Sequence, residues 1–221
     1  MATGYRKASD LPQVIPVFPL DGALLLPGGQ LPLNIFEPRY LNMLDDAMGG
    51  ERIIGMIQTR HGADDDPERP KLAAVGCAGK VTSFAETTDG RYLITLTGIC
   101  RFEAGEELPA RTPYRQVRAR FAPFEHDLTS IEADLALDRG PFLTALKHYL
   151  ERRGLDIDWE SAEGAPCDAL VNSLSMALPF DVQEKQLLLE ARTAEDRRTA
   201  LIAMLEIDAA AGPDDEPSAI Q

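Results

Sequence analysis

The chain has 221 residues, of which 44% are hydrophobic and 26% are charged, the usual balance of a globular protein. Its formal net charge is −14, and residues 126–221 hold 20 of the 36 acidic residues but only 8 of the 22 basic ones, so a nucleic-acid-binding surface is not expected. No apolar run approaches the roughly 20 residues that cross a bilayer, and the N-terminus lacks the apolar core of a secretion signal, which together predict a cytoplasmic protein with no membrane partner.

The first half of the chain is expected to be a β-domain. Residues 1–13 are predicted to be a flexible N-terminus, and residues 14–125 a small barrel. The barrel opens with three short apolar runs that Pro and Gly interrupt, at residues 14–18, 24–26 and 31–36, a pattern typical of strands at barrel bends. Pro38 then begins a helix, and Gly49-Gly50 ends it.

Further strands are predicted at residues 52–59, 73–86, 91–104 and 114–124, which gives about seven strands and one helix. The segment Thr88-Asp89-Gly90 joins two of them and predicts a hairpin with a type I′ turn. In the last strand Arg118 and Arg120 share a face, which favours a charged edge strand.

After Pro123 the apolar period changes to that of helices, and residues 126–210 are predicted to form a helical bundle. A helix capped by Asp127 or Thr129 is expected to run through Leu135 and Leu137. Others are expected at residues 140–154 and 169–178, and after two capping residues, Asp181 (with Glu184 in capping-box position) and Thr193. The polar residues 211–221 are predicted to be disordered.

No catalytic motif is found. The chain has neither a phosphate-binding loop nor a nucleophile elbow, and His61, His126 and His148 are far apart in sequence. The three cysteines show no C-x-x-C spacing, and the loop at residues 61–71 lacks the ligand spacing of a calcium-binding loop. No metal or cofactor is therefore expected.

The apolar residues near the turns of residues 14–44 form the candidate site. Strand alternation places about half of them in the barrel interior, and exposed apolar patches tend to mark interaction sites. An apolar rim that binds polypeptides is predicted, made of Leu20, Leu25, Leu26, Leu33 and Phe36.

Three segments carry a family resemblance: IPVFPLDGALLLPGGQLPLNIFEPRYLNML, the later LTGICRF, and DVQEKQLLLEARTAEDRRTALIAMLE. They resemble the N-terminal, substrate-binding domain of Lon proteases, from about residue 14 to residue 207. The resemblance implies an α+β fold, with a PUA-like β pseudo-barrel followed by a C-terminal α-helical bundle. The ATPase and Ser–Lys peptidase modules of the family have no counterpart in the sequence, so a stand-alone domain of bacterial type without peptidase activity is expected.

The function implied is non-catalytic binding of polypeptides, as an adaptor or chaperone-like factor in protein quality control. The implied partners are unfolded or tagged polypeptides, a full-length Lon protease and further copies of the chain. Two rival functions stay open: an uncharacterised hydrolase, which needs a polar pocket with shifted titratable groups, and a PUA-like RNA-binding protein, which needs the arginines of residues 111–120 on one basic face.

Four residues are predicted to form a structural junction between strand and helix: Glu37, Arg39, Tyr40 and Arg101. Charges embedded in apolar runs usually need partners, so Glu37 is expected to pair with Arg101 or with Arg39.

Overall fold

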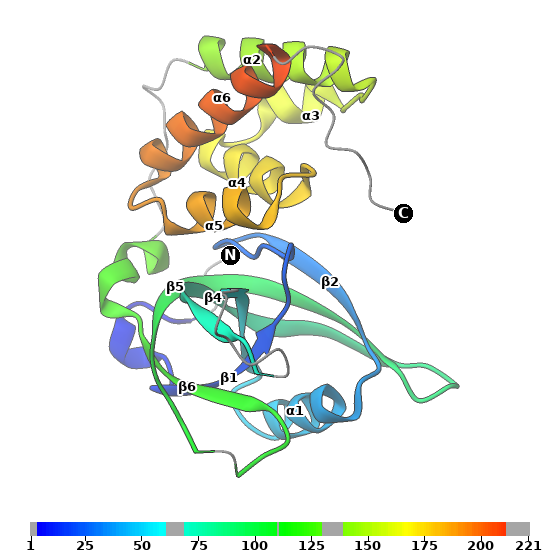
Figure 1. Ribbon diagram of the computed structural model, residues 1–221, viewed down its shortest axis with the longest axis vertical. Coiled ribbons are helices and arrows are strands. Elements are labelled where there is room, and N and C mark those ends of the chain that lie inside the picture. Colours follow the sequence, from blue (N-terminus) through cyan, green and yellow to red (C-terminus); the bar gives the residue numbers. More distant parts are fainter. Residues whose placement is uncertain (1–3, 61–68, 110, 130–138, 211–221) are drawn as a thin grey trace. The chain divides into compact units, whose positions relative to one another are not determined.

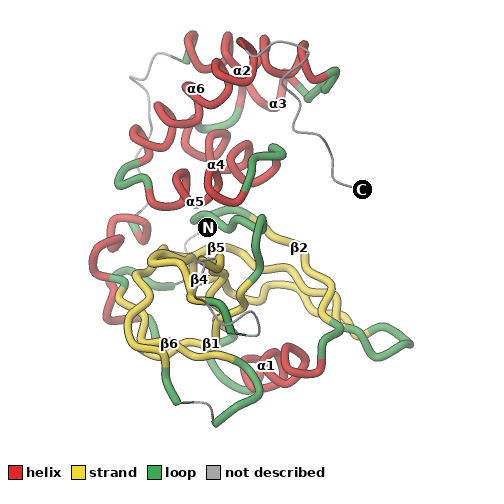
Figure 2. Tube along the Cα trace, in the orientation of Figure 1, coloured by secondary structure: helices red, strands yellow, loops and turns green. Residues whose placement is uncertain are grey.

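The computed structural model describes residues 4–60, 69–109, 111–129 and 139–210 (Figure 1). Contacts divide the chain into two compact units, Met1–Glu132 with Asn172–Glu190 (unit 1) and Ala133–Val171 with Ala191–Gln221 (unit 2). Figure 2 shows the strands in unit 1 and helices in both units. The sequence analysis groups all of residues 126–210 in one bundle, whereas the contacts group Asn172–Glu190 with the strands. The division of the chain at residues 13, 125 and 210 stays a prediction.

Unit 1 is built on a mixed six-stranded sheet in the order β2-β5-β4-β3-β1-β6, in which β6 also pairs with β5. Five strands thus close into a barrel. The sixth, β2, pairs with β5 at Tyr92–Thr97, whereas β6 pairs with β5 at Glu103, Ala104 and Glu107. The strands are β1 (Val14–Pro19), β2 (Gln30–Ile35), β3 (Ile53–Arg60), β4 (Lys71–Glu86), β5 (Tyr92–Glu107) and β6 (Arg115–Arg120).

Two of the strand predictions are wrong. Residues 24–26 form no strand, because they pair with no neighbouring strand in a ladder. The segment around Arg118 and Arg120 is not an edge, because β6 has β1 on one side and β5 on the other. The β4–β5 hairpin is present, but its turn is not type I′: Gly90 has φ 77°, whereas Asp89 lacks the positive φ that such a turn requires.

The helices of unit 1 follow their local signals. They are η1 (Ala8–Asp10), α1 (Pro38–Met48), η2 (Ala122–Leu128), α5 (Val182–Glu190) and the part of α4 (Cys167–Ala177) from Asn172 onward. The prediction for α1 is confirmed at both ends, with Pro38 in the first turn and Gly49 as C-cap. The predicted capping box of α5 is also confirmed: the Asp181 amide donates to Glu184 and the Glu184 amide donates to Asp181, both at 2.8 Å.

Unit 2 contains α2 (Gly140–Arg153), α3 (Trp159–Gly164), the first half of α4, and α6 (Ala194–Ala210), which Thr193 caps as predicted. The sequence analysis missed α3, although Asp158 is a strong N-cap residue and its carboxylate accepts the Ser161 amide. The Arg139 guanidinium donates to the last carbonyls of α3, at Ala162 and Glu163. Asp208 of α6 pairs with Arg152 and Arg153 of α2.

Three predictions fall largely on residues outside the described ranges. Leu135 and Leu137, the expected continuation of a helix, lie there, and η2 ends at Leu128. Most of the acidic loop at residues 61–71 and all of residues 211–221 lie there too.

Candidate functional site

The structure separates the five predicted rim residues into two groups. Leu25 and Leu26 are 1% and 0% exposed, so their predicted place on an exposed rim is wrong. They reach the core because Gly79 and Gly98 have no side chains: a Cβ would lie 2.7 Å from Leu25 Cδ2 at the first and 2.1 Å from the Leu26 carbonyl oxygen at the second. Leu20 and Leu33 are partly exposed, and the Phe36 side chain is 63% exposed.

The partly exposed Leu33 and the exposed Phe36 lie on and directly after β2, which pairs with the outer part of the β4–β5 hairpin. Beyond Lys80, β4 no longer pairs with β3, and only β2, β5 and β4 continue together. Figure 1 shows the tip of this hairpin projecting beyond α1. Leu33, Ile94 and Phe84 are register partners across the three strands and therefore share one face.

On that face the Phe84 ring lies 4.9 Å from the Tyr92 ring, and 42% of Phe84 is exposed. Leu93 lies on the opposite face, paired with Asn34 and Ala85, and is 46% exposed. We call the set Leu33, Phe36, Phe84, Tyr92 and Leu93 the hairpin surface. It presents apolar side chains on both faces of a three-stranded projection.

The sequence analysis missed Phe84 and Leu93 because strand alternation alone does not tell which part of a strand leaves the barrel. A usable signal exists in the strand lengths. The hairpin strands β4 and β5 have 16 residues each, whereas β3 has 8 and β1 has 6. Strands that are longer than their neighbours in the barrel must extend beyond them.

The predicted junction is divided between two places. Glu37 contacts one of its two expected partners: Arg39 donates to it at 2.9 Å, and both side chains are about half exposed. The Arg39 guanidinium also lies 4.7 Å from the centre of the buried Tyr40 ring, which packs on Phe18. Arg101 is elsewhere and does not pair with Glu37.

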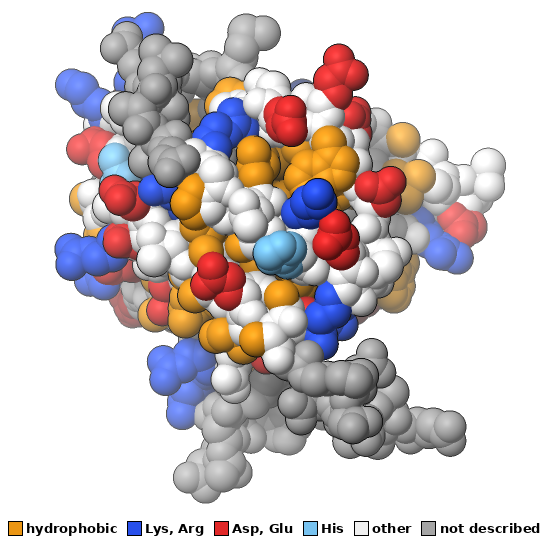
Figure 3. Space-filling view, turned by 90° about the horizontal axis from the view of Figure 1, so that it is seen from above, with side chains coloured by type: hydrophobic (Ala, Val, Ile, Leu, Met, Phe, Trp, Pro, Cys, Tyr) orange, Lys and Arg blue, Asp and Glu red, His pale blue; other side chains and the backbone are white. Residues whose placement is uncertain are grey.

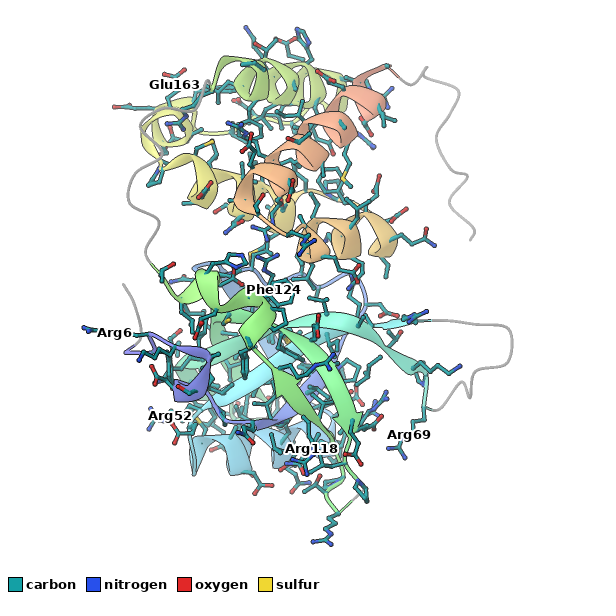
Figure 4. The ribbon with its side chains drawn as sticks, turned by 90° about the vertical axis from the view of Figure 1, so that its left-hand side faces the viewer. Arg6, Arg52, Arg69, Arg118, Phe124 and Glu163 are labelled. Carbon is teal, nitrogen blue, oxygen red and sulfur yellow. The ribbon has the colours of Figure 1, made fainter. Side chains whose placement is uncertain are left out.

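Arg101 is 1% exposed and is held by a dense set of contacts. Its Nε and Nη2 donate to the two carboxylate oxygens of Asp127, both at 2.9 Å, and its Nη1 donates to the Leu189 carbonyl at 3.1 Å. Its Nη2 also lies 3.1 Å from His126 Nε2, and its guanidinium lies 4.4 Å from the centre of the Phe124 ring. Figure 4 labels Phe124 on η2. The Arg101 side chain thus connects β5 to η2 and α5.

The arginines of β6 are each matched by a carboxylate of β5. Arg115 pairs with Glu107 at 2.7 Å and Arg120 with Glu103 at 2.6 Å. Arg118, labelled on β6 in Figure 4, lies 3.5 Å from Glu106. On the face shown in Figure 3, basic side chains are likewise interspersed with acidic ones. The basic face that phosphate binding needs is therefore not formed by β6.

The three cysteines offer little for catalysis. All three cysteines are buried, and burial, with the nearby Asp127 charge, raises the pKa of the Cys100 thiol far above its usual range. Among the residues that the structure describes, no three His, Cys, Asp or Glu side chains gather in a way that could hold a metal ion. Within the same ranges, no helix has the length and apolar character needed to cross a membrane.

Comparison with known sequences gives one family. Residues 14–206 match the model of the ATP-dependent protease La (LON) substrate-binding domain. The Lon protease of Flavobacterium johnsoniae is 22% identical over 211 residues, which cover 90% of this chain and 24% of that protein. Lon protease 2 of Myxococcus xanthus is 28% identical over 115 residues, 52% of this chain and 14% of that protein. The chain thus spans about a quarter or less of the length of these relatives.

Comparison with solved structures gives the same fold. A Lon N-terminal domain protein from Xanthomonas campestris has a TM-score of 0.61 at 21% identity, and the match covers 86% of this chain and 97% of that one. The N-terminal domain of a Mycobacterium avium complex Lon protease has a TM-score of 0.58 at 17% identity, covering 87% and 98%. At these identities the likeness establishes the α+β fold.

Proposed function

The chain belongs to the family of Lon substrate-binding domains, and from this membership we propose that it binds polypeptide segments, without cleaving them, through the hairpin surface. The observation that carries the proposal is the exposure of aromatic and aliphatic side chains on a projecting hairpin: Phe36, Phe84 and Leu93. Apolar groups of an unfolded chain gain free energy when they leave water against such side chains.

The proposed role is that of an adaptor or chaperone-like factor in protein quality control. Its partners would be unfolded or tagged polypeptides and a Lon protease, and its place of action the cytoplasm. A role as a hydrolase is less supported, because all three cysteines are buried and burial raises the pKa of the Cys100 thiol. A role in RNA binding is less supported, because the β6 arginines are already paired with carboxylates.

The expected loss of binding free energy follows from the exposed area of the side chains that are substituted. Burying a whole Phe side chain contributes about 1.5–3 kcal/mol, so the exposed half of such a ring contributes about 1 kcal/mol. Loss of Phe36 and Phe84 together is then expected to weaken binding by at least about tenfold, since 1.4 kcal/mol is a factor of ten.

The test is a titration of the protein into a fluorescently labelled globular protein that has been reduced and carbamidomethylated, so that it stays unfolded without added charge. We expect binding that the double variant Phe36→Ser/Phe84→Ser weakens at least about tenfold. Leu155→Ser is the matched control, because Leu155 is also about half exposed but lies outside the hairpin surface. Equal affinity of the wild type and the double variant would refute the proposed site, and absence of binding would refute the function.

A further inference from the structure

One side of the hairpin surface combines aromatic rings with carboxylates. The Phe84 and Tyr92 rings are 4.9 Å apart and inclined by 59°. Glu86 is the register partner of Tyr92, so its side chain leaves the same face of the hairpin. The Asp45 carboxylate of α1 lies close enough to the Tyr92 hydroxyl to raise its pKa. We call Asp45, Phe84, Glu86 and Tyr92 the aromatic–acidic cluster.

The negative charge of this cluster is not neutralised by neighbouring arginines. Arg91 is engaged with Asp89 at 2.8 Å, and Arg39 is engaged with Glu37 at 2.8 Å. Within the described residues, no basic side chain lies within ion-pair distance of Asp45 or Glu86. These carboxylates raise the pKa of Tyr92. The interaction of its hydroxyl with Asp45 is the largest cause, partial desolvation is the second, and the charges of Asp45 and Glu86 raise the pKa further.

Exposed aromatic faces beside free carboxylates favour an organic cation. A Lys or Arg side chain gains from the ring quadrupole when it lies over an aromatic face, and it gains again from a charge-assisted hydrogen bond to a carboxylate. A carboxylate in the ligand would meet two like charges at the same place. The cluster therefore distinguishes polypeptides by the charge next to their apolar residues.

We propose that the aromatic–acidic cluster binds a Lys or Arg side chain of a polypeptide whose neighbouring apolar residue contacts Leu33, which lies on the same face of the hairpin as Phe84. This inference rests on the proposed function of the hairpin surface and specifies its ligand: apolar segments flanked by basic residues. Segments flanked by acidic residues bind more weakly, which gives the chain a selectivity that apolar contact alone does not supply.

The test uses three fluorescent peptides with one apolar core, flanked by Lys, by Ser or by Glu, and measures their anisotropy on titration with the protein. The Lys-flanked peptide is expected to bind at least about fivefold more tightly than the Glu-flanked one at low salt, and the ratio should fall as salt is added. Glu86→Gln should reduce the ratio to about twofold or less. Glu206→Gln removes the same charge from α6 in unit 2 and should leave the ratio unchanged. Asp45 is not substituted, because its charge also acts on the Tyr92 hydroxyl.

The outcomes separate the two proposals. If the three peptides bind equally well, the hairpin surface binds apolar segments but the selectivity for basic flanks is refuted. If Glu86→Gln and Glu206→Gln lower the ratio equally, the selectivity comes from the overall charge and the cluster is not the site. If no peptide binds, the proposed function fails together with this inference.

Discussion

Arg101 illustrates how one buried side chain connects segments that are far apart in the sequence. It lies on β5, and its partners are Asp127 on η2 and the Leu189 carbonyl on α5. A buried charge is stable only when such partners are complete, and removal of one member leaves the other uncompensated. The sequence indicated that Arg101 needs a partner, but it could not indicate Asp127, because that pairing depends on the path of η2.

We expect Arg101→Met to lower the free energy of unfolding by about 3–5 kcal/mol, because Asp127 would stay buried without its counter-ion. Arg39→Met is the matched control: the Arg39–Glu37 pair is half exposed, so its loss should cost less than about 1 kcal/mol. Urea denaturation followed by circular dichroism measures both. Similar values for the two variants would show that burial does not strengthen the Arg101 network.

Glu107 makes stability depend on pH. Hydrogen bonds from Arg115 lower its pKa, partial burial opposes them, and a hydrogen bond from Arg69 lowers the pKa further. Because the folded-state pKa lies below the unfolded value of about 4.3, the stabilisation is complete above that value and is lost as pH falls through the folded pKa.

Glu107→Gln should therefore lower the free energy of unfolding by about 1.5–3 kcal/mol at pH 7, and the difference from wild type should shrink as the pH is lowered from 5 to 3. Glu106→Gln is the control, since its carboxylate lies 3.5 Å from an exposed Arg118 and should contribute little. Denaturant titrations at several pH values measure the difference. A Glu107→Gln penalty that is constant from pH 7 to pH 3 would contradict the account.

At the scale of elements, the features that could be predicted are those with local causes. Pro38 and Gly49 delimit α1, and Asp181 with Glu184 begins α5. The closure of β6 on β5 could not be predicted, because its register is set by pairing across the barrel and not by the residues of β6 themselves. The burial of residues 24–26 has a similar cause: it needs the close approach that Gly79 and Gly98 permit.

We expect Gly98→Ala to be destabilising, because its Cβ would lie 2.1 Å from the Leu26 carbonyl oxygen, a backbone atom that can shift only with its segment. The expected cost is about 1–3 kcal/mol. Gly49→Ala serves as control, because its Cβ would meet only ordinary contacts and its φ is negative. Thermal and urea unfolding measure both. A neutral Gly98→Ala would show that the segment of Leu25 and Leu26 is loosely packed.

At the scale of the whole molecule, composition and resemblance predicted the fold class but not the grouping of its helices. Asn172–Glu190 packs with the strands because specific side chains hold it there. The buried Gln58 amide donates to the Val182 carbonyl at 3.0 Å, and the Asn172 amide donates to the Pro27 carbonyl at 3.1 Å. These contacts join residues more than a hundred positions apart, which no local pattern reveals.

The candidate site was predictable in kind but only partly in its members. The apolar excess of residues 14–44 indicated a binding surface, and Phe36 is indeed exposed. Phe84 and Leu93 come from another part of the chain and are brought onto the same three-stranded projection as β2 by the β2–β5–β4 register. A rim drawn from one segment could not include them.

Amide hydrogen exchange, read by mass spectrometry with and without a saturating unfolded polypeptide, shows directly whether the hairpin surface binds polypeptides. Slower exchange is expected in residues 30–36 and 82–97, which include the projecting part of β2, β4 and β5, and unchanged exchange is expected in α2 and α6. Protection confined to other segments, or no protection at saturation, would contradict the assignment of the hairpin surface as the polypeptide-binding site.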